Sequence, residues 1–282
     1  MAKFVPDVKT QRWIVISPSR SSRPDEHVGV PLNVCPFCCG NENTTPAEIL
    51  RLGEGHKNCP GWKIRVVPNK YPITDIHEVI IHSPDHDKDI EDFEIDQVEL
   101  LLNVYRLRFQ AHVMDGQVMI FCNHGEHAGA SLTHPHSQLV VLPRQINLDA
   151  LVREPVMNVI EDNNFFITYC PDFSQWPYEM WIAPKKNGTA FGDVTDEEVK
   201  DLSLILQNAL KRLSKKYTEP ETKKIHDNTP FAYNYYIHHG RDWFVRIIPR
   251  LIHRAGFELG TGLSVNVIDP SEAARELKEV EI

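Results

Sequence analysis

The sequence predicts an α+β fold in which two related halves share one antiparallel sheet, with the helices packed on one face. Short runs rich in β-branched residues are typical of strands, and some of them end at a proline. Two longer stretches instead carry apolar residues at helical spacing. The order of strands and helix is found twice, at an offset of about 105 residues, which indicates two halves of one kind. Hydrophobic residues make up 41% of the 282 residues, so the chain can bury a sizeable core.

The first half is predicted to hold strands on both sides of one helix. The helix covers about residues 95–113, where apolar side chains recur every three or four positions. Pro68 and Pro84 end two of the strands, because proline cannot donate to a strand ladder. The predicted strands are residues 11–17, 62–67, 77–82, 117–122 and 139–142.

The second half repeats this order. Thr195 and Glu198 form a capping box that opens a helix, and an apolar stripe at helical spacing follows. The letters repeat as well, since Leu142-Pro143-Arg144 matches Ile248-Pro249-Arg250 at the end of the last strand of each half. The predicted strands are residues 165–169, 179–183, 232–237 and 243–248. The two predicted domains are an N-terminal half at residues 1–150 and a C-terminal half at residues 151–282.

The composition excludes several classes of protein. The net charge is −9, from 30 basic and 39 acidic residues, whereas a general nucleic-acid binder has an excess of basic residues. No apolar run approaches the roughly 18 residues of a membrane span. Residues 1–10 lack the charged-then-apolar pattern of a secretion signal. We therefore expect a cytoplasmic protein, with neither nucleic acid nor membrane as partner, that meets phosphate groups with a local positive cluster.

The strongest functional pattern is the segment Gly129–Gln138, which contains His134-Pro135-His136 and leads into an apolar strand. Pro135 fixes a backbone angle between the two histidines and so stiffens the presentation of both rings. A neutral histidine ring is a competent nucleophile towards phosphorus. Gln138 can donate a hydrogen bond to a phosphoryl oxygen, and small residues at 129–131 let backbone amides approach an anion closely. The alternative is a loop with two solvent-facing histidines.

Cys35-Pro36-Phe37-Cys38 is a candidate metal-binding pattern. Three of the six cysteines fall within five residues, and a large chain without an export signal favours metal or redox chemistry over a disulfide framework. A tetrahedral zinc site needs two further ligands, for which His86 and His134 are the candidates. Four protein ligands would close the site and make it structural. The alternative is a pair of buried thiols with unrelated histidines.

Two arginines and an asparagine are candidates for phosphate recognition. Arg20 and Arg23 lie in a loop rich in serine and proline, and Asn69 follows a strand that ends at Pro68. On an acidic protein, paired arginines in a rigid loop can recognise phosphate. The alternative is that both arginines are ordinary solvated side chains.

Seven segments spread over nearly the whole chain share the pattern of one family. They are Arg12–Pro18, Cys35–Cys38, Gly40–Glu42, Val66–Pro72, Ser83–His86, His134–Gln138 and Gly256–Gly260. Together they resemble the galactose-1-phosphate uridylyltransferase family, within the histidine-triad superfamily, and the combination is highly specific. The resemblance implies two histidine-triad-like halves, of which only the first carries the His-x-His-x-Gln motif.

The resemblance also implies roles for the matching residues. His136 corresponds to the nucleophile that becomes uridylylated, and Gln138 corresponds to the residue that holds the phosphoryl group, with Ser131 near it. The implied ligands of one structural Zn²⁺ per chain are Cys35, Cys38, His86 and His134. The implied contacts to nucleotide or phosphate are Arg20, Arg23, Asn69 and Asn123. The implied sugar contacts, made partly from the other subunit of a homodimer, are Phe257 and Glu258.

The activity implied by the resemblance is a ping-pong transfer of UMP. His136 attacks UDP-glucose and expels glucose 1-phosphate, and galactose 1-phosphate then takes the uridylyl group. Many members have a His-x-His near the last core strand, and some use it for a second metal. Here that stretch reads Asp242-Trp243-Phe244-Val245-Arg246, so a second metal site is not expected.

Other functions remain open at this stage. An ADP- or GDP-sugar phosphorylase of the same superfamily, and a relative that cleaves dinucleoside tetraphosphates, would share the chemistry of His136. They would differ in the base and in the acceptor, which one sequence does not reveal. A zinc-stabilised nucleotide-binding protein without turnover is a further alternative.

Overall fold

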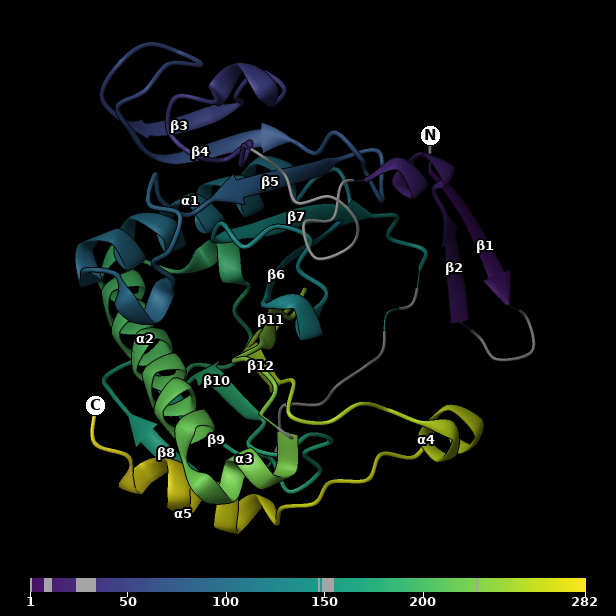
Figure 1. Cartoon of the computed structure of the whole chain (residues 1–282), viewed down its shortest axis with the longest axis vertical. Helices are drawn as coiled ribbons and strands as arrows, with labels where there is room; N and C mark the ends of the chain where they lie inside the picture. The colour runs from purple at the N-terminus through teal and green to yellow at the C-terminus, as the bar shows by residue number, and fades with distance from the viewer. Residues whose placement is uncertain (1, 8–11, 24–33, 147, 149–154, 227) are drawn as a thin grey trace.

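The computed structural model describes residues 2–7, 12–23, 34–146, 148, 155–226 and 228–282. Within them, ten strands form one antiparallel sheet and two more form a separate hairpin (Figure 1). The hairpin consists of β1 (Lys3–Asp7) and β2 (Arg12–Ile16). The predicted boundary between residues 150 and 151 lies outside the described residues.

The large sheet has the strand order β3-β4-β5-β7-β6-β11-β12-β10-β9-β8. The first five strands in the chain are β3 (Leu50–Gly53), β4 (Trp62–Pro68), β5 (His77–Ile81), β6 (Gln117–His124) and β7 (His136–Leu142). The next five are β8 (Val159–Asp162), β9 (Phe166–Tyr169), β10 (Met180–Pro184), β11 (Tyr233–Ile237) and β12 (Val245–Pro249). β6 pairs with β11, so one sheet continues from the first five strands into the second five.

Both sets of five strands follow the same order when counted outward from the β6–β11 contact. In each set, the fourth strand in the chain is central, followed by the fifth, third, second and first. This shared order supports the predicted division into two histidine-triad-like halves, which itself stays a prediction.

Two long helices cover one face of the sheet. They are α1 (Ile95–His112) and α2 (Asp196–Thr218), which contact each other (Figure 1). Thr195 caps α2, because its hydroxyl accepts from the amide of Glu198 and the Glu198 carboxylate accepts from the amide of Thr195. The shorter helices are α3 (Pro220–His226), α4 (Gly256–Thr261) and α5 (Pro270–Glu279).

The alternation of side chains along β7 sets the position of the functional residues. Leu139 and Val141 belong to the main core between the sheet and the helices. His136 and Gln138 alternate with them and therefore face the other side of the sheet. That opposite face carries small apolar clusters, one of which includes Phe37 and Leu132. The predicted antiparallel α+β architecture, with helices on one face, is confirmed.

Every predicted strand and helix is present in the structure, although some begin or end at other residues. The structure also contains further strands and α-helices that were not predicted. β7 begins at His136, three residues before the predicted start at Leu139, because the ladders with β5 and β6 include the polar residues His-Ser-Gln. The elements that the sequence did not predict are β1, β3, β8, α3, α4 and α5. Among the described residues, no helix has the length and apolar character needed to cross a bilayer.

Candidate active site and metal cluster

His136 is the first residue of β7 and lies opposite Ile81 of β5. Its side chain is buried, and the edge of the Phe37 ring lies near it, with 5.2 Å between ring centroids. Nδ1 of His136 donates to the main-chain oxygen of His134 at 2.8 Å. A neutral ring that donates from Nδ1 keeps a lone pair on Nε2. This tautomer is compatible with the predicted role of His136 as a nucleophile, which itself stays a prediction.

Gln138 lies two residues further along the same face of β7. Its Oε1 is 2.9 Å from Nε2 of His77 and 3.4 Å from Nδ2 of Asn69. Oδ1 of Asn69 accepts from the amide of Tyr71 at 2.8 Å, which turns the NH₂ group of Asn69 towards Gln138. Gln138 is thus held by its oxygen, and its own NH₂ group remains for another partner.

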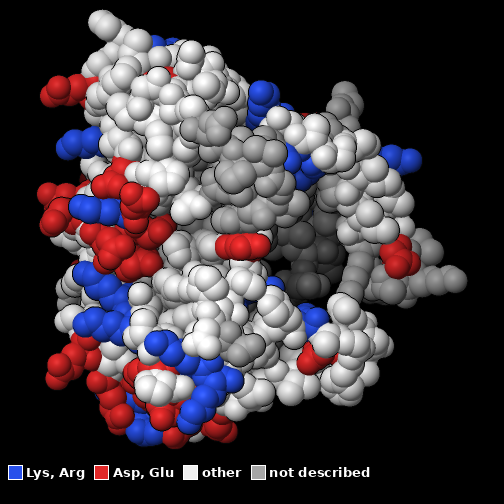
Figure 2. Space-filling view, in the orientation of Figure 1, with Lys and Arg blue, Asp and Glu red and all other residues white. Residues whose placement is uncertain are grey.

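A cavity of about 300 Å³ adjoins these residues. Five of the predicted site residues line it, namely Arg23, Asn69, Ser131, His136 and Gln138. Apolar side chains form much of the remaining wall, among them Val34, Pro36, Phe37, Pro46, Val67 and Leu132. An apolar wall with a few converging polar groups is typical of a small-molecule site. Figure 2 shows a hollow between the β1–β2 hairpin and the body of the sheet, with Lys and Arg side chains at its margins.

The loop before β7 differs from the expectation that its amides face an anion. Gly129, at φ 80°, ends a short 3₁₀ turn at Glu126–Ala128. Its amide donates to the oxygen of Glu126, and the amide of Ala130 donates to the oxygen of Gly125. These two amides close the turn, and the residues of this loop that line the cavity are the buried Ser131 and Leu132.

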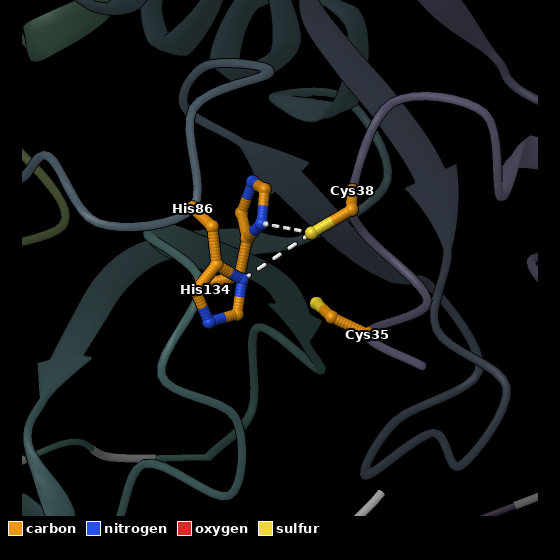
Figure 3. Close-up of side chains that lie close together, drawn as sticks. All are labelled: Cys35, Cys38, His86 and His134. Carbon is orange, nitrogen blue, oxygen red and sulfur yellow. Dashed lines mark hydrogen bonds between the residues drawn. The ribbon is translucent and has the colours of Figure 1, made fainter. Parts of the chain in front are cut away.

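Cys35, Cys38, His86 and His134 come together as predicted, with their ligand atoms all within 4.8 Å of one another (Figure 3). Nδ1 of His86 and Nδ1 of His134 both point at Sγ of Cys38, at 3.3 Å and 3.7 Å. Nε2 of His134 donates to the main-chain oxygen of Ser83 at 2.9 Å, which leaves Nδ1 for a metal. Burial raises the pKa of the Cys35 thiol to about 11, so a thiolate there needs a cation beside it. The residues therefore fit a metal ion bound by two sulfurs and two nitrogens.

The metal cluster is directly coupled to the nucleophile. His134 offers its ring to the cluster and its main-chain oxygen to Nδ1 of His136. The peptide between them is held as well, because the amide of His82 donates to the oxygen of Pro135 at 3.1 Å. Gln97 of α1 in turn donates to the oxygen of His82. A metal at this cluster therefore fixes the segment that orients His136.

The two predicted arginines have different surroundings. Arg23 lines the cavity and donates to the oxygen of Gly129 at 3.5 Å. Arg20 donates to the oxygen of Tyr71 at 2.8 Å and is not among the described residues that line the cavity. Burial and the charge of Arg23 lower the pKa of Arg20. The pair places two positive charges at one margin of the site, one of them facing the cavity.

Asn123 lies at the end of β6, on the strand next to that of His136. Its Oδ1 accepts from Nδ2 of Asn234, which is its paired residue on β11. Asn234 also donates to the oxygen of Ala128 at 2.8 Å. Asn123 is thus oriented from the second set of strands, and it is not among the described residues that line the cavity, so its contact with nucleotide or phosphate stays a prediction.

Phe257 and Glu258 lie in α4, which Figure 1 shows apart from β5 and β7, and neither is among the described residues that line the cavity. Phe257 is 55% exposed, and the carboxylate of Glu258 accepts from the amide of Ala255 at the start of the helix. Within one chain, the structure does not bring these two residues to the other predicted site residues. Their role at the sugar stays a prediction that requires a second copy of the chain.

The face of the sheet formed by β10 and β12 carries an ion pair. The guanidinium of Arg246 donates to both carboxylate oxygens of Glu179, at 2.7 Å and 3.0 Å, and both side chains are buried. Among the described residues, the cluster around Cys35 is the one group of potential metal ligands found.

The sequence reasoning missed three residues of this region. Phe37 was named only as part of the Cys35-Pro36-Phe37-Cys38 pattern and given no role, yet it lines the cavity and packs against His136. Lys70 also lines the cavity. His77 was read only as the start of a strand, yet its side chain is buried and contacts Gln138.

Comparisons with known proteins agree with this fold. The family model described as galactose-1-phosphate uridyl transferase, N-terminal domain, matches residues 73–143. An ADP-glucose phosphorylase from Arabidopsis thaliana is 27% identical over 98% of this chain and 92% of its own length. A galactose-1-phosphate uridylyltransferase from Thermotoga maritima is 25% identical over 97% of this chain and 96% of its own.

Solved structures give the same result. The crystal structure of an ADP-glucose phosphorylase from Arabidopsis thaliana with bound ADP-glucose superposes with a TM-score of 0.75 at 26% identity, covering all of both chains. A uridylyltransferase structure superposes with a TM-score of 0.72 at 23% identity, over 99% of this chain and 97% of the other. The first supports both fold and relationship, whereas the second supports the fold alone.

Fold, site and relatives together define a protein of the class of nucleotidyltransferases and nucleotide-sugar phosphorylases. Within that class, this chain is similar to the galactose-1-phosphate uridylyltransferase family, by the family model over residues 73–143 and by relatives that match nearly its whole length.

Proposed function

We propose that this protein transfers a nucleotidyl group from a nucleoside diphosphate hexose to a phosphate-bearing acceptor, through a covalent adduct on His136. The observation that carries the proposal is the orientation of His136, whose Nδ1 donates to the oxygen of His134 beside a cavity that Gln138 and Arg23 also line. A protein that only bound nucleotide would need no histidine held in this way.

The chemistry follows from the groups around the cavity. Nε2 of His136 attacks the α-phosphorus, and the bond from that phosphorus to the bridging oxygen breaks, so that hexose 1-phosphate leaves with the electron pair. An oxygen of the acceptor phosphate then attacks the same phosphorus and releases Nε2. Both the leaving group and the acceptor are already ionised, so neither step requires a general base. The NH₂ group of Gln138 and the charge of Arg23 stabilise the phosphoryl oxygens.

The donor and acceptor that the sequence suggested are UDP-glucose and a hexose 1-phosphate, as in a uridylyltransferase. The second candidate is ADP-glucose with inorganic phosphate, and a specific observation favours it. The relative named ADP-glucose phosphorylase matches 98% of this chain at 27% identity, and its crystal structure contains ADP-glucose. The apolar wall with Phe37, Val67 and Leu132 suits either base.

The metal proposed for the cluster is one structural Zn²⁺ per chain. Two sulfur and two nitrogen ligands are the donor set that zinc prefers in closed tetrahedral sites. When bound, the ion would hold the Cys35–Cys38 loop, His86 and His134 together without taking part in the transfer. We further propose a homodimer in which α4 of one chain brings Phe257 and Glu258 to the site of the other.

The test is the mass of the intact protein after separate incubation with UDP-glucose, ADP-glucose and GDP-glucose, with His136→Ala as the matched control. We expect one of these donors to add a nucleoside monophosphate to the protein and His136→Ala to add none. A UMP adduct that galactose 1-phosphate removes supports the uridylyltransferase. An AMP adduct that inorganic phosphate removes supports the phosphorylase. No adduct from any donor, or an adduct that persists in His136→Ala, would contradict the proposal.

A further inference from the structure

We propose that His77 is a positioning residue of this active site, which fixes the direction of the Gln138 amide so that its NH₂ group faces the cavity. The inference rests on the proposed function, because it assigns a task to Gln138 in nucleotidyl transfer. His77 does not line the cavity among the described residues, so it acts through Gln138 and not on the substrate.

The tautomer of His77 follows from its ring contacts to the main chain of Ile73 and to Gln138. A third neighbour, Nδ2 of Asn69, lies 3.1 Å from Nε2 and is itself a donor, so it cannot accept the ring proton. Nδ1 is 2.9 Å from the amide nitrogen of Ile73, which is a donor, so Nδ1 must accept and carries no proton. The proton of the neutral ring is therefore on Nε2. Nε2 lies 2.9 Å from Oε1 of Gln138 and donates to it.

The surroundings of His77 keep this arrangement in place. His77 is only 4% exposed and lies in β5, where its pair on β7 is Val140 and Gln138 is a diagonal neighbour. Burial, with the charges of Arg20 and Arg23, lowers the pKa of His77 to about 4, so the ring is neutral at physiological pH. A neutral ring can keep both its hydrogen bonds, to Ile73 and to Gln138. In a protonated ring, Nδ1 would also carry a proton, which would face the N–H of Ile73 and break that hydrogen bond.

A second donor confirms which end of the Gln138 amide is held. The amide of Tyr71 fixes Oδ1 of Asn69, so Nδ2 of Asn69 faces both His77 and Gln138, at 3.1 Å from Nε2 and 3.4 Å from Oε1. Because the protonated Nε2 cannot accept, Oε1 of Gln138 is the acceptor for Nδ2. With two N–H donors facing it, the inner atom of the Gln138 amide must be its oxygen. The outer atom is then the nitrogen, on the side of the cavity that Gln138 lines.

The direction of this amide decides whether Gln138 helps or hinders transfer. In the arrangement described, two N–H groups face the phosphoryl oxygens, whose charge grows as His136 attacks. A flipped amide would present an oxygen to them and repel that charge. Loss of His77 should therefore slow the formation of the adduct with little change in donor binding.

The test compares His77→Leu and His77→Gln with the wild-type protein, using the donor that gives the adduct. Loss of one donor to a developing oxyanion typically slows a reaction by about 10²–10³-fold. We expect His77→Leu to lower the single-turnover rate at saturating donor by roughly tenfold or more, with donor KM changed by less than about threefold. His77→Gln, which can still donate an N–H, should recover part of the rate. The matched control is His226→Leu, because His226 in α3 is equally buried at 4% exposure and remote from the cavity, and its rate should equal the wild-type rate.

A double-mutant cycle separates positioning from an independent effect. Because His77 acts through Gln138, His77→Leu should slow Gln138→Ala by less than about twofold. An equal loss in both backgrounds, or a His77→Leu protein as fast as wild type, would overturn the inference.

Nitrogen NMR of the histidine rings gives a readout that needs neither turnover nor a foldable His77→Leu. The ring signals of His77, identified by their absence in His77→Gln, should show a proton on Nε2 between about pH 5 and 8. They should shift in Gln138→Ala, because Gln138 is their acceptor. A proton on Nδ1 would overturn the inference even if the adduct forms. A protein that shows the Nε2 tautomer but forms no adduct would contradict the proposed function alone.

Discussion

At the scale of single residues, His134 serves two groups at once. Its ring belongs to the metal cluster, and its main-chain oxygen accepts from Nδ1 of His136. The ring and the carbonyl belong to one residue, so a shift of the His134 main chain would move both. If a metal binds the ring, as proposed, its removal is therefore expected to disturb the orientation of His136 as well.

Cys35→Ala should lower metal content, stability and transfer rate together. Removing one of four ligands leaves an open site, and metal binding to such sites is coupled to folding. We expect a loss of several kcal/mol, on the order of 3 kcal/mol, in the free energy of unfolding. Metal analysis with urea titration measures it. Cys39→Ala is the matched control, because Cys39 is exposed and outside the cluster, and it should behave as wild type. A metal-free Cys35→Ala protein of wild-type stability would refute the structural site.

Glu91 predicts a pH dependence of stability. Burial, with the nearby Asp89 carboxylate, raises the pKa of Glu91 from 4.5 to about 7, and the hydroxyl of Tyr233 donates to it at 3.3 Å. Because the folded protein disfavours the ionised form, Glu91 makes the protein lose stability as the pH rises from about 4.5 to about 7. Glu91→Gln cannot ionise. Its stability relative to wild type should therefore rise by about 2–3 kcal/mol between pH 5 and pH 8, as measured by urea unfolding. A difference that does not change with pH would contradict this.

At the scale of elements, the ion pair between Arg246 of β12 and Glu179, which precedes β10, replaces apolar packing on one face of the sheet. The carboxylate of Glu179 also accepts from the indole of Trp181 and the amide of Gln175. Its negative charge is buried and has one cation to balance it. The main energetic role of Arg246 is therefore to offset the cost of burying the charged carboxylate of Glu179.

Arg246→Met should destabilise the fold by about 3–5 kcal/mol, because it leaves the Glu179 carboxylate buried and unpaired. Adding Glu179→Gln removes that charge and should restore part of the loss. Urea titration of the two single variants and the double variant measures the coupling. A double variant whose loss equals the sum of the two single losses would show that the charges do not interact.

The elements also show how far sequence reasoning reaches. The long helices and the strands with β-branched runs were predicted, because the hydrophobic period and the helix caps can be read within a short stretch of sequence. The capping residue Thr195 of α2 is an example. The start of β7 at His136 was not, because His-Ser-Gln is a strand only through its two neighbouring ladders. The metal cluster was predicted from residue types and the family resemblance. His77 could not be, since its hydrogen bond to Gln138 spans 61 residues and depends on strand register.

At the scale of the whole molecule, the ten-stranded sheet has no break between its two sets of strands. β6 and β11 pair over five residues from Tyr233 to Ile237, and α1 packs on α2. One core contains Leu101 and Ile120 from the first set together with Ile205 and Tyr235 from the second. The proposed halves, residues 1–150 and 151–282, thus share both a ladder and a core.

We expect the two halves to unfold as one cooperative unit. Separating them would expose the edge of β6 and the apolar face that α1 shares with α2, which neither half can cover alone. Hydrogen exchange in mild denaturant, read by mass spectrometry on peptides from β4 and from β12, measures this. The most protected amides of both strands should open with free energies that agree within about 1 kcal/mol. Opening of β12 well below the value for β4 would mean that the halves are separate units.

The contact between β6 and β11 has a consequence for the folding of the chain during its synthesis. On the ribosome, β6 is complete at His124, but its partner begins only at Tyr233. At a synthesis rate of about 5–20 residues per second, the edge of β6 remains unpaired for roughly 5–20 s until β11 is synthesised. During that interval the nascent chain presents a half-sheet that already contains His136 and the four metal ligands. Metal taken up at this stage would hold the early half together, so that metal supply during translation, and not only afterwards, sets the yield of folded protein.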